Sequence, residues 1–102
     1  MKHFLIKYRF EHGSREEWHQ EIARFIEALE SDPVVGGRIT YRAMKAKDPD
    51  YYHLASTADD EATKVLSDRD FFKRYTEITE RVSGGTVEVL PLEIVAETKL
   101  KA

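Results

Sequence analysis

The four histidines are the residues of this chain best suited to move a proton at neutral pH, because the pKa of a free histidine is about 6.5. We expect His12 and His19 to face water. His53 lies within the strand-like run 51–54, and we predict that it acts as a general base near neutral pH. The alternative is a half-exposed strand histidine whose ring makes a structural hydrogen bond.

The sequence gives no indication of a metal site or of a reactive thiol. The histidines form neither a helical pair four residues apart nor an HExxH motif. The chain has no cysteine, which excludes thiolate zinc sites, iron–sulfur clusters, disulfides and cysteine nucleophiles. It also lacks the GxSxG, P-loop and GxGxxG motifs. We therefore expect no metal and no cofactor.

Two tyrosines occupy positions from which a phenol hydroxyl could contact a ligand in a pocket. Tyr8 stands on the apolar side of a predicted strand, and Tyr75 stands on the apolar stripe of a predicted helix. Both should point into the space between sheet and helices, where a buried hydroxyl needs a partner that a ligand can supply. The alternative is a pair of core aromatics bonded to backbone or water. Together with His53, Tyr75 is the candidate catalytic residue.

Further tyrosines and arginines extend the candidate site. Tyr41 and Tyr52 fall on the two strands of a predicted hairpin, and nearby arginines offer positive charge to an anionic or enolate oxygen. The alternative places these arginines in ion pairs at an interface between subunits. The candidate substrate-binding residues are Tyr8, Tyr41, Tyr52, Arg9 and Arg42.

The first element that must position these residues is a strand, followed by a long helix. Alternating apolar and polar residues over 3–10 predict a strand with one face on the core. Ser14 and Glu17 form a capping box that opens a helix, in which apolar residues recur at helical spacing. Asp32-Pro33 ends this helix, because proline disfavours helical geometry in the residue before it.

Three further strands follow from alternation and turn residues. Strands are predicted over 38–45 and 51–57, and the turn Asp48-Pro49-Asp50 joins them into a hairpin. A last strand is predicted over 86–90. Pro91 cannot donate a backbone hydrogen bond, so it marks an edge, a bulge or a break, and the chain should continue extended after it.

Two helices are predicted between the third and fourth strands. A short one should begin near Thr57 or Asp59. A second, capped by Ser67-Asp68 or Asp70, carries aromatic and aliphatic residues at helical spacing. Gly84-Gly85 ends it, since glycine adopts the left-handed conformation of a helix C-terminus without strain.

The resulting order β-α-β-β-α(α)-β is that of a ferredoxin-like α+β sandwich with an antiparallel four-stranded sheet. With 102 residues, the chain is predicted to form one domain over 1–102. The strands offer apolar side chains to both faces of the sheet, and helices cover one of them. An apolar second face on so small a domain favours a homodimer.

The chain resembles the antibiotic biosynthesis monooxygenase-like family of the dimeric α/β-barrel superfamily. The resemblance rests on the strand ending at Glu11-His12-Gly13, the helix starting at residues 14–17 and the strand entry at Val35-Gly36-Gly37. The run from Leu66 to Tyr75 also matches, with a short helix, a break and a helix that opens with an aromatic residue. Their order and spacing carry the likeness over nearly the whole chain.

This resemblance implies two sandwiches whose sheets meet in a shared barrel, with a pocket between sheet and helices in each subunit. It implies a cofactor-independent monooxygenase that acts on a small aromatic or quinol-like metabolite. In that reaction a base such as His53 would remove a phenolic or enolic proton, and the anion would react with oxygen. The alternative is a non-catalytic small-molecule-binding or structural homodimer of the same fold.

Haem degradation is not expected. Haem-degrading members are similar to one another in using an asparagine of the first strand, a helix tryptophan and a histidine of the third helix. The chain has no asparagine, its single tryptophan is Trp18 in the first helix, and residues 71–82 contain no histidine. The missing asparagine also favours the non-catalytic alternative.

Charge and hydropathy limit the partners. Sixteen basic residues against 19 acidic ones give a net charge of −3, which does not favour nucleic acid. The predicted third strand, 51–57, lacks the aromatic run of an RNA-recognition motif. No apolar run approaches the roughly 20 residues that cross a bilayer. We expect a cytoplasmic protein that binds a small molecule and neither nucleic acid nor membrane.

Overall fold

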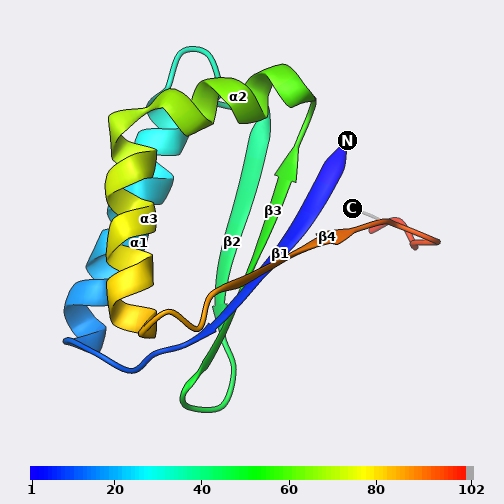
Figure 1. Cartoon of the computed structure of the whole chain (residues 1–102). Helices are drawn as coiled ribbons and strands as arrows, with labels where there is room; N and C mark the ends of the chain where they lie inside the picture. Colours follow the sequence, from blue (N-terminus) through cyan, green and yellow to red (C-terminus); the bar gives the residue numbers. More distant parts are fainter. Residues whose placement is uncertain (101–102) are drawn as a thin grey trace.

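Strands and helices alternate in the order β-α-β-β-α-α-β, which confirms the predicted ferredoxin-like α+β fold (Figure 1). The computed structural model describes residues 1–100 of the chain. The elements are β1 (Lys2–Arg9), α1 (Arg15–Ser31), β2 (Ile39–Lys45), β3 (Asp50–Thr57), α2 (Asp60–Asp68), α3 (Asp70–Ser83) and β4 (Glu88–Leu92).

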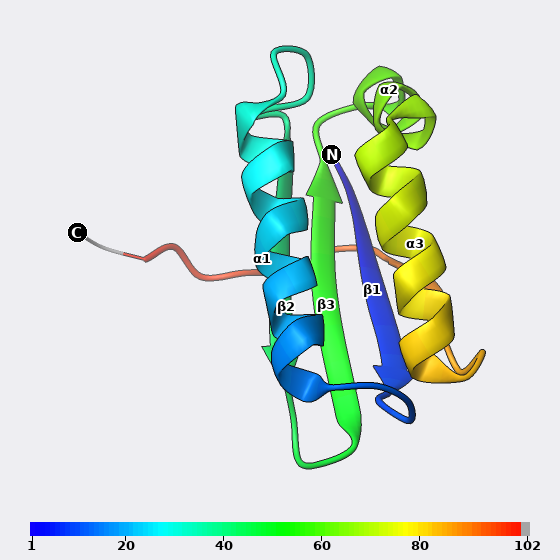
Figure 2. The same ribbon diagram turned by 90° about the vertical axis from the view of Figure 1, so that its left-hand side faces the viewer.

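The four strands form one antiparallel sheet in the order β2-β3-β1-β4, so β1 and β3 are its central strands. Helices α1 and α3 lie side by side on one face of this sheet, and α2 lies near the end where β3 finishes (Figures 1 and 2). Within residues 1–100, no helix covers the opposite face. We call it the open face.

The register of the strands decides which side chains meet the helices, because successive side chains of a strand point to opposite faces. Ile6 of β1 pairs with His53 of β3, and both belong to the helix-covered face. Leu5 pairs with Leu54 on one side and with Leu90 on the other, so these three lie on the open face. If a strand paired one residue out of register, its helix-facing side chains would move to the open face and its open-face side chains would meet the helices.

Helices α1 and α2 begin at residues that cap their first turns, as the sequence predicts. Ser14 Oγ accepts a hydrogen bond from the Glu17 N–H at 3.3 Å, and the Asp59 carboxylate accepts one from the Ala62 N–H at 2.8 Å. α1 ends at Ser31, with Asp32 as its C-cap, in agreement with the predicted proline stop.

Helix α3 begins differently, and the predicted side-chain cap from Ser67-Asp68 or Asp70 is wrong. Arg69 occupies the capping position and makes no capping hydrogen bond. Its guanidinium instead donates to the Asp32 carboxylate, with Nε 2.9 Å from Oδ2, and so ties the start of α3 to the end of α1. Gly84 ends α3 with a φ of 61°, as predicted.

The last strand lies two residues later than predicted, at Glu88–Leu92 instead of 86–90. Pro91 is part of it and pairs with Phe4. β4 is an edge strand, the position within a sheet at which proline is tolerated. Residues 93–100 form no helix or strand.

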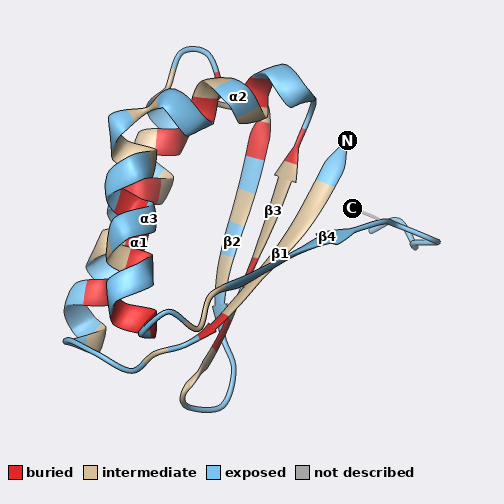
Figure 3. Cartoon of the chain, in the orientation of Figure 1, coloured by how far each residue is buried: buried red, intermediate tan, exposed pale blue. Residues whose placement is uncertain are grey.

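Buried residues gather on the inner sides of α1 and α3 and on the sheet face beneath them (Figure 3). α1 contributes the predicted stripe, in which Trp18, Ile22, Phe25 and Leu29 are buried. β4, by contrast, is exposed along its length. Within residues 1–100, no helix combines the length and the hydropathy that crossing a bilayer requires.

Candidate functional site

A cavity of about 350 Å³ lies between the sheet and the helices α2 and α3. Apolar side chains make up most of its wall. Its polar lining residues are Tyr41, Tyr75, Thr57, Thr63, Thr76, Thr79 and Glu80. A cavity with an apolar wall and a few placed polar groups suits a small, mostly apolar molecule.

His53 sits behind this wall, fully buried, at the centre of a hydrogen-bond network. Its Nε2 lies 2.8 Å from Tyr8 Oη, and its Nδ1 lies 2.6 Å from Tyr41 Oη. Tyr75 Oη lies 3.0 Å from Tyr41 Oη and 3.3 Å from His53 Nδ1. His53 itself does not line the cavity, so it reaches a ligand only through Tyr41 and Tyr75.

The donors and acceptors of the network give it a direction. The indole N–H of Trp18 can only donate, and it donates to Tyr8 Oη at 2.9 Å. The Tyr8 hydroxyl then has His53 Nε2 as its acceptor, so a neutral imidazole carries its hydrogen on Nδ1 and donates to Tyr41. Tyr41 and Tyr75 share one further hydrogen bond, in which either hydroxyl can donate. One hydroxyl hydrogen of this pair is therefore left without an acceptor among the described residues.

Burial keeps every member of this network uncharged near pH 7. It lowers the pKa of His53 to about 4. It also raises the pKa of Tyr8, Tyr41 and Tyr75 above the ordinary tyrosine value. The phenols are therefore protonated and the imidazole is neutral. With Nε2 occupied by Tyr8, His53 offers no free lone pair, and direct proton removal by His53, the sequence expectation, does not fit this geometry.

The network forms because side chains from three strands and from helix α3 point into the same region. Tyr8 on β1, Tyr41 on β2 and His53 on β3 all stand on the helix-covered face of three adjacent strands. Tyr75 comes from α3 above them. Its ring stacks on Phe25 with centroids 3.9 Å apart, which fixes the direction of its hydroxyl.

Thr57 supplies a second polar feature of the cavity. It lies four residues after His53 on β3, on the same face, and is 4% exposed. Its Oγ1 is the one buried side-chain polar atom without a hydrogen-bond partner among the described residues. An unpaired buried hydroxyl costs about 1–3 kcal/mol, and a polar group on a bound molecule would relieve that cost.

Three residues that the sequence assigned to substrate binding, Tyr52, Arg9 and Arg42, lie on the open face, away from the cavity. The reason is the strand period of two. Tyr52 stands between Tyr51 and His53, which face the helices, so its own side chain points the other way. The structure therefore unites His53, Tyr75, Tyr8 and Tyr41, and separates these three from them.

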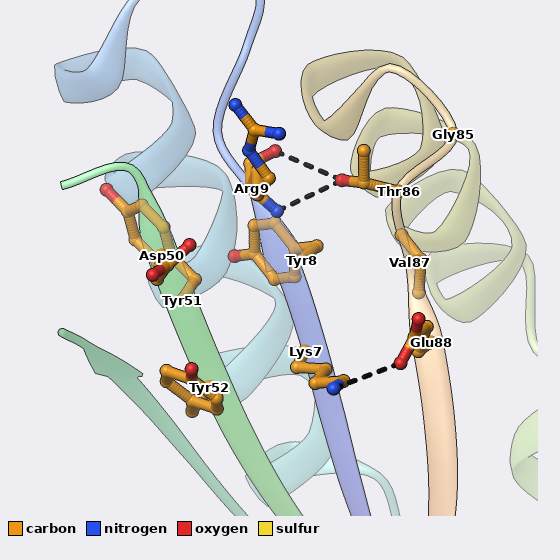
Figure 4. A pocket seen from close by; sticks show the side chains of 10 residues that line it. All are labelled: Lys7, Tyr8, Arg9, Asp50, Tyr51, Tyr52, Gly85, Thr86, Val87 and Glu88. Carbon is orange, nitrogen blue, oxygen red and sulfur yellow. Dashed lines mark hydrogen bonds and ion pairs between the residues drawn. The ribbon is translucent and has the colours of Figure 1, made fainter. Parts of the chain in front are cut away.

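Arg9 and Tyr52 instead line a hollow of about 480 Å³ near the turn that leads into β4 (Figure 4). This hollow is polar and open, and several of its groups are already paired. Lys7 Nζ lies 3.1 Å from Glu88 Oε2, and the Arg9 N–H donates to Thr86 Oγ1 at 3.0 Å. No buried atom of its lining lacks a partner. For this reason we place the candidate site in the smaller cavity.

Sequence reasoning missed three members of the site: Trp18, Thr57 and Glu80. Trp18 carries an N–H that needs an acceptor when buried, which was the signal for its link to Tyr8. Thr57 shares the strand face of His53 by alternation. Glu80 follows Thr76 by four residues on the helix face that meets the cavity. Within residues 1–100, no cluster of three metal-binding side chains is present.

We expect Thr57→Val to raise the free energy of unfolding by about 1 kcal/mol, because it replaces an unpaired buried hydroxyl by a methyl group. Urea denaturation measures the change. Thr79→Val is the matched control: the Thr79 hydroxyl donates to the Tyr75 carbonyl at 2.7 Å, so its loss should destabilise the protein. Equal destabilisation by both substitutions would show that Thr57 Oγ1 is satisfied in the native protein.

No protein-family profile matches the chain, and no curated protein matches it. Solved structures do. SnoaB, described as a cofactor-independent oxygenase from Streptomyces nogalater, superposes with a TM-score of 0.72 at 17% identity, covering 99% of this chain and 97% of that one. A structure described as an antibiotic biosynthesis monooxygenase gives a TM-score of 0.75 at 12% identity, covering 94% of this chain and all of the other.

A third neighbour is described as a dimeric ferredoxin-like protein of unknown function from Jannaschia sp. CCS1. Its TM-score is 0.71 at 13% identity, and the alignment covers 92% of this chain and 100% of that one. At such identities the likeness establishes the fold alone. In fold, the chain resembles the antibiotic biosynthesis monooxygenase structures, as the sequence predicted.

Proposed function

We propose that this protein is a cofactor-independent monooxygenase that acts on a small aromatic, quinol-like metabolite in the 350 Å³ cavity. The observation that carries the proposal is the pair of phenols Tyr41 and Tyr75, which line an apolar cavity and have one hydroxyl hydrogen between them free to donate. The fold shared with SnoaB, itself described as a cofactor-independent oxygenase, supports it.

The proposed reaction balances with molecular oxygen as the oxidant. Removing a proton from a CH₂ group beside an aromatic ketone gives an enolate, which is electron-rich enough to reduce O₂. Recombination forms a C–OOH hydroperoxide, and loss of water leaves a new C=O group. One oxygen atom of O₂ enters the product and the other leaves as water. The substrate supplies all the electrons, so the step needs no redox cofactor.

The cavity residues take distinct parts in this reaction. The Tyr41–Tyr75 pair is the catalytic donor, because its free O–H can stabilise negative charge that develops on the substrate oxygen. His53 is a positioning residue that holds Tyr41 and Tyr75 in order. Among the described residues Glu80 is the one carboxylate that lines the cavity, and we assign it the role of proton acceptor.

The test is oxygen consumption over a panel of hydroquinones and anthrones, each corrected for its spontaneous oxidation. We expect the protein to accelerate uptake with at least one compound. The double variant Tyr41→Phe/Tyr75→Phe should lower kcat by about 10²-fold, the usual effect of losing one charge-stabilising donor, because either phenol alone could still donate. Glu80→Gln should lower it by about 10²-fold or more, since it removes the general base.

Glu77→Gln is the matched control, because Glu77 is an exposed carboxylate on the same helix that does not line the cavity. It should keep the full rate. Oxygen uptake no faster than the blank with every compound would contradict the proposed activity. Full rates in both the double tyrosine variant and the Glu80 variant would remove these residues from the mechanism.

One observation favours the second candidate function, a non-catalytic protein that binds a small molecule. The pKa of His53 is lowered to about 4 and both of its ring nitrogens are engaged, so the imidazole is not free to take a substrate proton. In that case the cavity would hold its ligand unchanged. Binding of panel compounds without accelerated oxygen uptake would support this binding function over the monooxygenase activity.

We also propose that two copies pair through their open faces into a homodimer. Leu54, Leu5 and Leu90 form a row across β3, β1 and β4, in direct register. Tyr52 and Leu92 extend this apolar surface, and Leu90 and Leu92 remain 40% and 43% exposed in the single chain. A second copy would bury this surface. The described dimer of the Jannaschia neighbour supports the proposal.

Analytical ultracentrifugation tests the dimer. The protein should sediment at about twice its chain mass of 11.8 kDa. Leu54→Lys should shift it to the monomer, because it places a charge in the middle of the apolar row. Gln20→Lys, on the exposed side of α1, should leave the dimer intact. A wild-type protein that sediments as a monomer would contradict the proposal.

A further inference from the structure

We infer that adjacent aromatic side chains form a path along which single electrons pass between the cavity and the surface of the protein. The members of the path, from the cavity wall outwards, are Tyr75, Trp18, Tyr8, Tyr51 and the exposed His19. The path goes beyond the proposed monooxygenase reaction, in which the substrate supplies all the electrons. It gives the protein a second activity, the repair of a radical in the cavity by a reductant in solution.

Each oxidisable ring of the path has another one as its direct neighbour. The Tyr75 ring stacks on the indole of Trp18, with centroids 5.6 Å apart and planes at 14°. The indole meets the Tyr8 ring edge-on at 6.0 Å and donates a hydrogen bond to its oxygen. Tyr8 and Tyr51 pair in register on β1 and β3, and their rings stack at 5.2 Å (Figure 4).

The remaining aromatic neighbours do not extend the path. Phe25 stacks on Tyr75 at 3.9 Å, and Phe10 lies 6.1 Å from Tyr51. A phenylalanine ring has no hydroxyl or indole nitrogen to stabilise the loss of an electron, so peroxyl radicals do not oxidise it. Tyr52 points to the open face and has no aromatic neighbour within residues 1–100. The oxidisable rings therefore lead from the cavity to one exposed residue, His19.

Two phenols of the path have an imidazole placed to take their proton. A phenol that loses an electron becomes a strong acid, so its oxidation is easy only where a base accepts the hydroxyl proton. Tyr8 Oη lies 2.8 Å from His53 Nε2, and Tyr51 Oη lies 2.8 Å from His19 Nε2. Imidazole is the side chain best suited to accept a proton at neutral pH. Electron loss at either phenol can thus be coupled to a short proton transfer.

The two imidazoles differ in burial, and this difference places the end of the path at Tyr51. His53 is fully buried, which lowers its pKa to about 4, so a proton that it takes from Tyr8 is soon returned. His19 is exposed, so water stabilises the charge that a transferred proton brings. A surface hollow of about 180 Å³ is lined by both His19 and Tyr51 and gives a small reductant access to this end.

The electrons and protons of the repair balance. A peroxyl radical in the cavity gains one electron through Tyr75 and one proton from water at the cavity mouth, where Thr76 and Glu80 are exposed. Each ring then regains its electron from the next ring along the path. Tyr51 loses one electron, and its hydroxyl proton passes to His19. A thiolate in solution returns one electron to Tyr51 and becomes a thiyl radical, and the proton moves back from His19.

Photo-oxidation tests the path without any turnover of substrate. The chain has no cysteine, so Thr76→Cys at the cavity wall provides a single attachment site for a ruthenium tris(diimine) dye. A light flash in the presence of a cobalt(III) ammine, which takes one electron from the excited dye, leaves an oxidant beside the cavity. Transient absorption gives the rate at which protein radicals appear. Electron paramagnetic resonance of samples frozen after the flash identifies the radical.

We expect a tyrosyl signal that Tyr51→Phe removes, which assigns the signal to Tyr51. Trp18→Phe should slow its appearance at least about tenfold, because it takes an oxidisable ring out of the middle of the path. His19→Gln should also slow it at least about tenfold, since an amide can form a hydrogen bond but does not accept the proton. Tyr52→Phe is the matched control, a phenol outside the path, and should leave the signal unchanged.

The repair itself is tested with a thiol in solution. We expect the thiol to shorten the lifetime of the Tyr51 signal in proportion to its concentration. A lifetime that the thiol does not change would contradict the repair of the path from the surface.

A tyrosyl signal that persists in Tyr51→Phe would overturn the inference, and so would an oxidised dye that recovers without any protein radical. Unchanged rates in both Trp18→Phe and His19→Gln, with circular dichroism showing folded proteins, would show that the electron does not follow these residues. Each of these results leaves the proposed monooxygenase reaction standing, because oxygen uptake decides that reaction. Failure of oxygen uptake would in turn leave the path standing, because the dye and not the substrate supplies the oxidant.

Discussion

The buried imidazole of His53 is the group on which the arrangement of the site depends. It accepts from the phenol of β1, donates to the phenol of β2, and lies within reach of the phenol of α3. Through Trp18 the same network extends to α1. His53 of β3 is thus linked to β1, β2 and α3 directly, and to α1 through Tyr8. A buried polar network of this kind is stable only when its members are paired, and here each internal donor meets an acceptor until the network reaches the cavity.

The neutrality of His53 follows from the same burial. Charging the ring would place a cation in a site that has no anion beside it, and the Tyr8 hydroxyl would lose its acceptor. The neutral ring therefore fixes which group donates and which accepts in its hydrogen bonds with Tyr8 and Tyr41. Proton transfer is left to the groups that line the cavity. This division separates a buried positioning residue from the phenol and the carboxylate that can touch a ligand.

The sheet divides the molecule into two functional faces. The helix-covered face holds the network and the cavity, while the open face carries the leucine row and the charged hollow of Figure 4. Strand alternation produces this separation, because neighbouring residues such as Tyr52 and His53 point in opposite directions. Ligand binding on one face and pairing of subunits on the other can therefore use adjacent residues without conflict.

Most of the fold was predictable from local sequence signals. Alternation, the caps at Ser14 and Asp59 and the glycine at 84 place nearly every element. The start of α3 was not predictable from local signals. Arg69 is held there by an ion pair with Asp32, which lies 37 residues away in the sequence, and no local pattern indicates such a contact.

The site was predictable in its residue types and only partly in its geometry. Tyr8, Tyr41, His53 and Tyr75 were identified by type and face, yet Tyr52 and Arg42 were assigned to the pocket although alternation within their own strands turns them away from it. The direction of the network depends on four distances between distant residues, and no sequence pattern contains those distances.

The most direct test of this account is a long-range ¹H–¹⁵N NMR spectrum of His53, identified by comparison with His53→Gln. The account predicts a neutral ring with its hydrogen on Nδ1 from neutral pH down to about pH 5, because burial lowers the pKa of His53 well below that of a free histidine. A hydrogen on Nε2, or a ring protonated at neutral pH, would reverse or break the order of donors and contradict the account.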